Sequence, residues 1–251
     1  SGRVLRARLR GDGGGVRYAL SQLTDEDQSP TLDAVSFAGA LDERLEAPFF
    51  THDFVEQAED VFGMIVKDTR AVEGFDVPVI GNRLIELGAN GAERTVWSTW
   101  DHWDPSVGDF VEEDGTWTHG NALDYDAGRD VYTVGFRGVD AVVEVDNGSG
   151  LALRQVGGPT SSYAELPKSD RQLGQHQFQW IDVGILLFDN HTEETGSRVL
   201  VLELDDAAGV ANDLHRNGQP QPGAHGAGGE ERVEDLLHQV AGNAHARVAD
   251  R

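Results

Sequence analysis

The feature that most constrains the fold is a unit that occurs three times and starts each time with a histidine. His52, His119 and His176 each open a short strand-like segment, followed by two apolar runs and a turn. The second runs are residues 61–68, 131–136 and 184–190, and the third runs are residues 83–87, 141–145 and 198–204. Repeated sets of short strands with no helix between them are typical of a β-propeller, in which each unit forms one blade.

The three histidines hold equivalent positions in these units. In a propeller the first strand of each blade lines the central channel, so equivalent residues of successive blades lie close together there. The Asn-Gly and Asp-Asn-Gly turns supply the positive φ that tight hairpins need. We therefore expect a histidine cluster in the channel. The alternative is three polar residues at strand edges with no shared task.

The repeat also sets the expected domain organisation. We expect an all-β propeller domain over residues 1–208, with blades beginning near residues 51, 118 and 175. Residues 1–50 are expected to contain only an incomplete N-terminal blade, and residues 209–251 a Gly/Pro-rich linker and a polar helical tail. Four or so recognisable blades are few for a closed ring. The chain is thus expected to be a truncated or altered propeller, or one that completes its ring as a homo-oligomer.

Charge and composition exclude several classes of protein. The chain has 44 acidic and 20 basic residues, a net charge of −24, and no cysteine. Nucleic acid is not expected as a partner, because phosphate binding needs clustered Lys and Arg. Disulfides and zinc-thiolate sites are excluded, and no apolar stretch is long enough to span a membrane. An acidic surface of this kind is typical of halophilic proteins, since high salt screens repulsion between carboxylates.

Two residues near the second histidine point to the chemistry of the site. Asn121 follows His119 by two positions and is expected on the same side of its strand, and Arg137 ends the next strand of that blade. A guanidinium can hold a tetrahedral oxyanion through several donors. Three imidazoles could also bind a metal ion, but an arginine beside a metal is electrostatically unfavourable. The residues therefore favour an anion site in which the histidines act as nucleophile, acid and base.

Several motifs in this order resemble the arylsulfate sulfotransferases, a family of six-bladed propellers. The motifs are residues 51–54, residues 116–122 with Arg137, Gly157-Gly158, Gln175-His176, residues 187–190 and Ser197-Arg198. They cover roughly residues 50–205. The resemblance implies that His176 is the nucleophile and becomes sulfated, while His52 and His119 lie around the sulfuryl group. It also implies substrate binding by Asn121, Arg137 and Trp117, and an extracytoplasmic (periplasmic or secreted) location.

The implied reaction transfers a sulfuryl group from an aryl sulfate donor to a phenolic acceptor through a sulfohistidine. It needs no metal and no other cofactor, and its partners are these two small molecules. Two other functions fit the residues. One is a propeller module that binds a small anion without changing it, and the other is a metal-dependent hydrolase that uses the three channel histidines.

Overall fold

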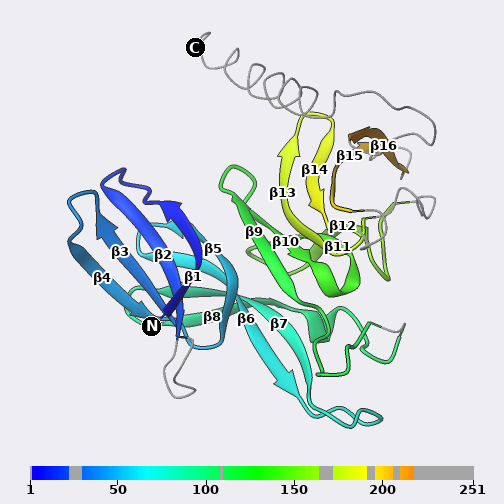
Figure 1. The fold of residues 1–251 in the computed structure, drawn as a ribbon, viewed down its shortest axis with the longest axis horizontal. Helices are drawn as coiled ribbons and strands as arrows, with labels where there is room; N and C mark the ends of the chain where they lie inside the picture. The colour runs from blue at the N-terminus through cyan, green and yellow to red at the C-terminus, as the bar shows by residue number, and fades with distance from the viewer. Residues whose placement is uncertain are drawn as a thin grey trace.

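The computed structural model describes residues 2–22, 30–107, 110–163, 172–190, 196–205 and 210–217. These residues form four antiparallel sheets of four strands each, and the strands of each sheet follow one another along the chain. Figure 1 shows the sheets arranged in sequence around the molecule. The all-β class and the propeller architecture predicted from the repeat are confirmed.

The first sheet has four strands where the sequence predicted only part of a blade. They are β1 (Gly2–Leu9), β2 (Gly15–Gln22), β3 (Thr31–Ser36) and β4 (Leu41–Glu46). The outer strand β4 reads Leu-Asp-Glu-Arg-Leu-Glu, and only Leu45 in it is buried. An edge strand that packs on one side carries too little apolar signal to be recognised from sequence.

The second and third sheets contain the first two histidine units. The second consists of β5 (Phe50–Ala58), β6 (Val61–Arg70), β7 (Val79–Gly88) and β8 (Glu93–Ser98), followed by the short 3₁₀ helix η1 (Thr99–Asp101). The third consists of β9 (Gly120–Asp126), β10 (Val131–Phe136), β11 (Ala141–Asp146) and β12 (Ala152–Gly157), with the 3₁₀ helix η2 (Arg137–Val139) between β10 and β11.

The fourth sheet extends into the region where the sequence predicted a linker. It consists of β13 (Gln175–Ile181), β14 (Gly184–Asp189), β15 (Arg198–Asp205) and β16 (Val210–Asn217). β16 pairs with β15 along its length and completes the sheet. Its sequence lacks the apolar alternation of a half-buried strand, so the sequence pattern predicts no strand there. The predicted helical tail lies outside the described residues.

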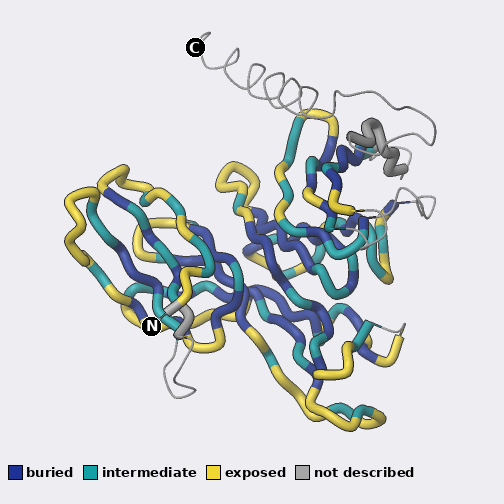
Figure 2. The backbone as a smooth tube through the Cα atoms, in the orientation of Figure 1, coloured by how far each residue is buried: buried dark blue, intermediate teal, exposed yellow. Residues whose placement is uncertain are grey.

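Apolar side chains fill the spaces between neighbouring sheets. All six residues of β10 are buried, as expected for a strand with a sheet packed on each face. The packing between the second and third sheets includes Trp97, Trp103, Trp117 and Phe136. Figure 2 shows buried residues along the middle of the strands and exposed ones at the hairpin tips. This packing fixes the inner strands β1, β5, β9 and β13 beside one another, where the candidate site lies.

Candidate active site

Two of the three predicted site histidines are in direct contact. The ring centroids of His52 on β5 and His119 just before β9 lie 4.8 Å apart. Both residues are half-buried and have left-handed backbone, with φ of 61° and 47°. His176, at the start of β13, is near enough for its charge to influence the pKa of both. The predicted contact is thus found between His52 and His119, and His176 lies at the start of the neighbouring inner strand β13.

The inner strands β5, β9 and β13 depart from regular pairing at or beside their histidines. The strand register shifts between Phe50 and Phe54 in β5 and between His176 and Phe178 in β13. In β9 the shift lies directly after Gly120. Bulges of this kind re-aim side chains and are frequent beside active sites. The regular alternation expected between His119 and Asn121 therefore does not hold at this point.

Arg137 approaches His119 through the backbone. As the first residue of η2, it donates its backbone N–H to the carbonyl oxygen of His119 over 3.1 Å. Its side-chain Nε is buried and has no hydrogen-bond partner among the described residues. A buried guanidinium donor without a partner is costly unless a ligand accepts its hydrogen bond. Arg137 is therefore suited to hold an anion beside the histidines.

The electrostatic environment keeps His52 and His119 uncharged at neutral pH. Burial lowers the pKa of His52 to about 4, and His176, Lys67, Arg3 and Arg137 add to the effect. Burial also lowers the pKa of His119 to about 4, with further contributions from His52 and Arg137. Neutral imidazoles can accept protons, and the surrounding positive charge favours a bound anion.

The contacts of His176 define which ring nitrogen is free. Its Nδ1 lies 3.1 Å from the carbonyl oxygen of Gly174 and 2.7 Å from the side-chain amide of Asn190. Both contacts are made by Nδ1, and none within the described part of the chain involves Nε2. Nε2 is therefore the ring nitrogen left for a ligand, and it can act as a nucleophile in the tautomer that has its proton on Nδ1.

The two other predicted binding residues differ in their placement. Asn121 is buried and its Nδ2 donates to the carbonyl oxygen of Gln175 over 2.7 Å, which links β9 to the residue before His176. Its Oδ1 has no partner within the described part of the chain.

Trp117, expected to bind substrate, is only 1% exposed and packs 5.0 Å from Trp100 in the core between the sheets. This placement corrects the expectation, because a side chain enclosed in the core cannot contact a channel ligand.

Sequence reasoning missed the polar residues that connect the inner strands. Asp53, directly after His52, is 1% exposed and forms ion pairs with Arg6 Nε at 3.0 Å and Arg8 Nη2 at 3.1 Å. Its carboxylate also accepts the backbone N–H of Leu123 over 3.0 Å. One side chain thus joins three sheets. The only sequence signal was an acidic residue between His52 and Phe54.

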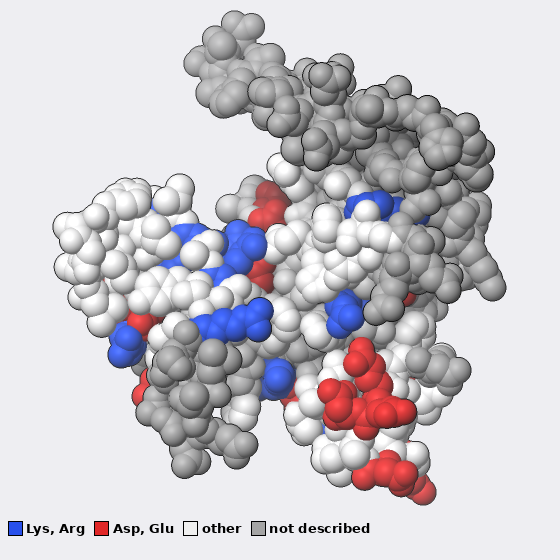
Figure 3. All heavy atoms as spheres, in the orientation of Figure 1, with Lys and Arg blue, Asp and Glu red and all other residues white. Residues whose placement is uncertain are grey.

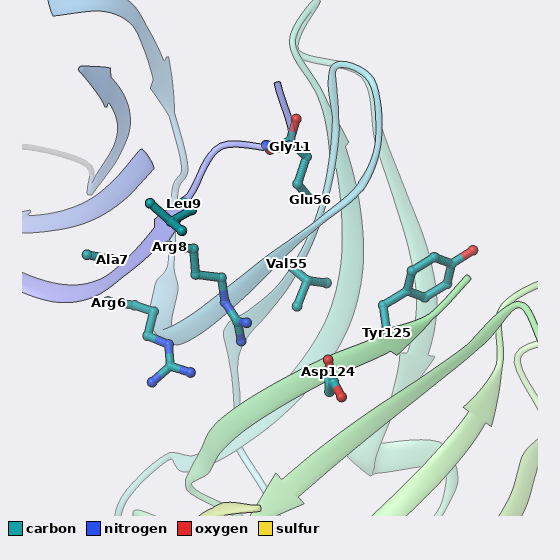
Figure 4. A pocket seen from close by; sticks show the side chains of 9 residues that line it. All are labelled: Arg6, Ala7, Arg8, Leu9, Gly11, Val55, Glu56, Asp124 and Tyr125. Atoms are coloured by element: carbon teal, nitrogen blue, oxygen red, sulfur yellow. The ribbon is translucent and has the colours of Figure 1, made fainter. Parts of the chain in front are cut away.

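A pocket of about 480 Å³ opens where β1 faces β5 and β9. It is lined by Arg6, Ala7, Arg8, Leu9, Gly11, Val55, Glu56, Asp124 and Tyr125. Figure 4 shows the guanidinium groups of Arg6 and Arg8 pointing from β1 toward the neighbouring strands. On the face shown in Figure 3, basic side chains gather near the middle and acidic ones toward the lower right. Arg6 and Arg8 thus place positive charge beside the inner strands.

The described residues contain no group of three or more His, Asp or Glu side chains arranged to hold a metal ion. They also include no helix capable of crossing a membrane.

The low pKa values of His52 and His119 lead to a testable pH dependence. Below pH about 6.5 the unfolded chain protonates these histidines, whereas the folded chain does so only near pH 4. Their contribution to stability is therefore present above pH 6.5 and is lost as the pH falls toward 4. We expect the melting temperature of His119→Gln to fall less than that of the wild type between pH 7 and pH 4.5.

The experiment compares the wild type with His119→Gln because Asp140 titrates in the same pH range as the histidines. Burial raises the pKa of Asp140 to about 6, which opposes the histidine effect between pH 4 and 6. The difference between wild type and His119→Gln removes this contribution. Melting curves by circular dichroism measure it, and parallel pH profiles of the two proteins would contradict the lowered pKa of His119.

The fold and the site define a β-propeller with a histidine cluster and an arginine at its channel. Residues 28–202 match the family model described as Arylsulfotransferase (ASST). The match covers more than half of the chain, which therefore belongs to the arylsulfotransferase family, a family of transferases. The resemblance seen in the sequence is confirmed. A sequence comparison with curated proteins gives no match.

Several solved structures are similar to this chain at low sequence identity. A protein of unknown function from Bacteroides caccae is 11% identical, with a TM-score of 0.51 over 86% of this chain and 66% of that one. Kuenenia stuttgartiensis hydrazine synthase is 11% identical, with a TM-score of 0.49 over 77% of this chain and 57% of that one. The chain thus spans less than two thirds of these proteins. The β-propeller domain of Cps50 (Swd1) from Myceliophteria thermophila is 10% identical, with a TM-score of 0.39 over 88% of this chain and 73% of that one.

Proposed function

We propose that this protein transfers a sulfuryl group from an aryl sulfate to a phenol through a sulfated His176. The observation that carries the proposal is the arginine Nε of Arg137, buried without a partner among the described residues and placed beside two neutral histidines. Membership of the arylsulfotransferase family supports the same class of reaction. The oxygens of a sulfate ester can accept the hydrogen bond that Nε of Arg137 does not make within the described part of the chain.

Binding of the donor comes first. The guanidinium of Arg137 and the second Nδ2–H of Asn121, whose first donates to Gln175, hold the sulfate oxygens and offset the charge that moves during the reaction. The bound anion also acts on the histidines, because a negative charge nearby favours imidazolium. The pKa of His119 and His52 therefore rises from about 4 when the donor binds, and the site takes up a proton.

Two displacements at sulfur then complete the transfer. Nε2 of His176 forms a bond to sulfur as the bond from sulfur to the aryl oxygen breaks, and His119 or His52 gives its proton to the leaving phenolate. The acceptor phenol loses its proton to the same histidine as its oxygen attacks sulfur and the N–S bond breaks. The acceptor leaves as an aryl sulfate, and His176 returns to its starting state.

Replacing Arg137 with lysine tests the anion-binding role. Lysine keeps the charge but loses the planar set of donors, so we expect kcat/KM for an aryl sulfate to fall about 100-fold or more. Arg129→Lys is the matched control, because Arg129 pairs with Glu144 in the same sheet. Steady-state kinetics measure both variants. An Arg137→Lys enzyme as active as Arg129→Lys would remove the anion-binding assignment.

The reaction itself is tested by release of phenol from a chromogenic aryl sulfate. The assay is run in high salt, which screens the repulsion produced by a net charge of −24. We expect release that depends on an added phenolic acceptor and is unaffected by chelation. Release that needs no acceptor and is lost on chelation would indicate a metal-dependent hydrolase. Absence of release in every condition would favour a module that binds an anion without changing it.

A further inference from the structure

Asn82 lies at the contact between the second and third sheets, next to the segment that carries His119. It belongs to β7 and is 3% exposed. No motif in the sequence marked it, and the reaction outlined above gives it no role. Its side chain makes contacts on both sides of the interface, so its position depends on the two sheets together.

The side-chain oxygen of Asn82 binds both neighbours of His119. Oδ1 accepts the hydroxyl of Thr118 over 2.8 Å and the backbone N–H of Gly120 over 2.8 Å. Thr118 is fully buried, and Gly120 is the first residue of β9. One oxygen atom therefore fixes the chain directly before and directly after the histidine.

The rest of Asn82 is fixed within its own sheet. Its Nδ2 donates to the carbonyl oxygen of Val66 over 3.3 Å. Its backbone N–H donates to Oγ1 of Thr99 over 3.0 Å, and the same hydroxyl donates to the carbonyl oxygen of Asn82 over 3.1 Å. Because every polar atom of Asn82 has a partner, the side chain is held in one position, and its Oδ1 is a fixed acceptor for the neighbouring sheet.

The backbone of His119 needs contacts that hold it in place. Its φ of 47° lies in the left-handed region, which residues with a side chain adopt only when their surroundings enforce it. Gly120 is held close to the second sheet, since a Cβ atom there would lie 2.9 Å from Cγ2 of Ile65. The contacts on either side of His119 thus maintain the conformation that directs its ring toward His52.

We propose that Asn82 is a positioning residue for His119 and sets the geometry of its proton transfer. This inference rests on the proposed function, in which His119 or His52 exchanges a proton with the phenol. The amide offers an uncharged acceptor, so it orders the segment without placing a negative charge near the ring. A carboxylate in its place would raise the pKa of His119.

Three variants separate positioning from general stability. Asn82→Leu removes the acceptor, and Thr118→Val removes one of its two donors with little change in shape. Asn147→Leu is the matched control, because Asn147 is also a buried amide that joins these two sheets, through Arg94. Asn147 comes directly after β11. At that end of the sheet Asp146 pairs with Val131, whereas His119 lies beside the opposite end.

We expect Asn82→Leu to lower kcat 10- to 100-fold, with KM changed less than about threefold, and Thr118→Val to lower kcat less. The ring signals of His119 in NMR spectra should shift in both variants, whereas those of His102 should not. Asn147→Leu should retain the kcat and the His119 signals of the wild type. Equal kcat losses in Asn82→Leu and Asn147→Leu, with unchanged His119 signals, would overturn the proposal.

Asn82→Asp gives a second readout if Asn82→Leu fails to fold. It keeps an acceptor for Thr118 and Gly120, so the His119 ring should stay in place, but its charge should raise the pKa of His119 measured by NMR. An unchanged pKa would show that Asn82 does not act on His119. The NMR readouts need no substrate, so failure of the sulfuryl-transfer assay with shifted His119 signals would refute the proposed function and leave the positioning role intact.

Discussion

The variant His176→Ala is expected to lose aryl sulfate turnover, with kcat reduced by at least about 10³-fold. Alanine leaves no atom to accept the sulfuryl group, so the two-step route is closed. The substitution removes Nε2, the ring nitrogen left free by the contacts of Nδ1 with Gly174 and Asn190. Phenol release from a chromogenic aryl sulfate, followed by absorbance, measures the effect.

His102→Ala is the control for this experiment. His102 packs against Trp97 at 5.1 Å and contacts Gln155 through Nε2, away from the inner strands. We expect this variant to be less stable than the wild type but to retain its kcat at a temperature where it is folded. If His176→Ala retained turnover comparable to that of His102→Ala, the nucleophile would have to be another residue.

Replacing Asp53 with alanine is expected to lower the free energy of unfolding by about 3 kcal/mol. The change leaves the backbone N–H of Leu123 without its partner and leaves Arg6 and Arg8 facing each other without their carboxylate. Burial raises the pKa of Asp53 despite the two arginines, so the ion pairs alone do not compensate for desolvation. The cost therefore comes mainly from the groups that lose their partner. Urea denaturation gives the free energy.

Asp33→Ala serves as the comparison for Asp53→Ala. Asp33 is fully buried and binds Arg44 through two hydrogen bonds, but both residues belong to the first sheet. We expect Asp33→Ala to reduce stability without changing kcat, whereas Asp53→Ala should reduce both, because Asp53 adjoins His52. A kcat loss shared by both variants would indicate that the site responds to the stability of the propeller as a whole.

The sequence was sufficient to predict the elements that are buried on both faces. The apolar runs of β10 and β11 have no polar alternation, so their type and order could be read directly. The contact between His52 and His119 followed from their equivalent positions in the repeat. Placement of Arg137 beside His119 followed from its position at the end of β10.

The missed features depend on three-dimensional contacts. The outer strands β4 and β16 carry polar sequences and are defined by pairing with β3 and β15. Trp117 was placed at the channel because it adjoins a site motif, but packing between sheets directs it into the core. Asn82 precedes His119 by more than 30 residues, and only the packing of neighbouring sheets brings its amide to Thr118 and Gly120.

The most direct test of the account is to trap the sulfated enzyme. The protein is incubated in high salt with a chromogenic aryl sulfate and no acceptor, and its peptides are then analysed by mass spectrometry. We expect one sulfuryl group per chain, located on His176 and lost on addition of a phenol. Phenol release without sulfation of His176, or sulfation that a phenol does not remove, would contradict transfer through this histidine.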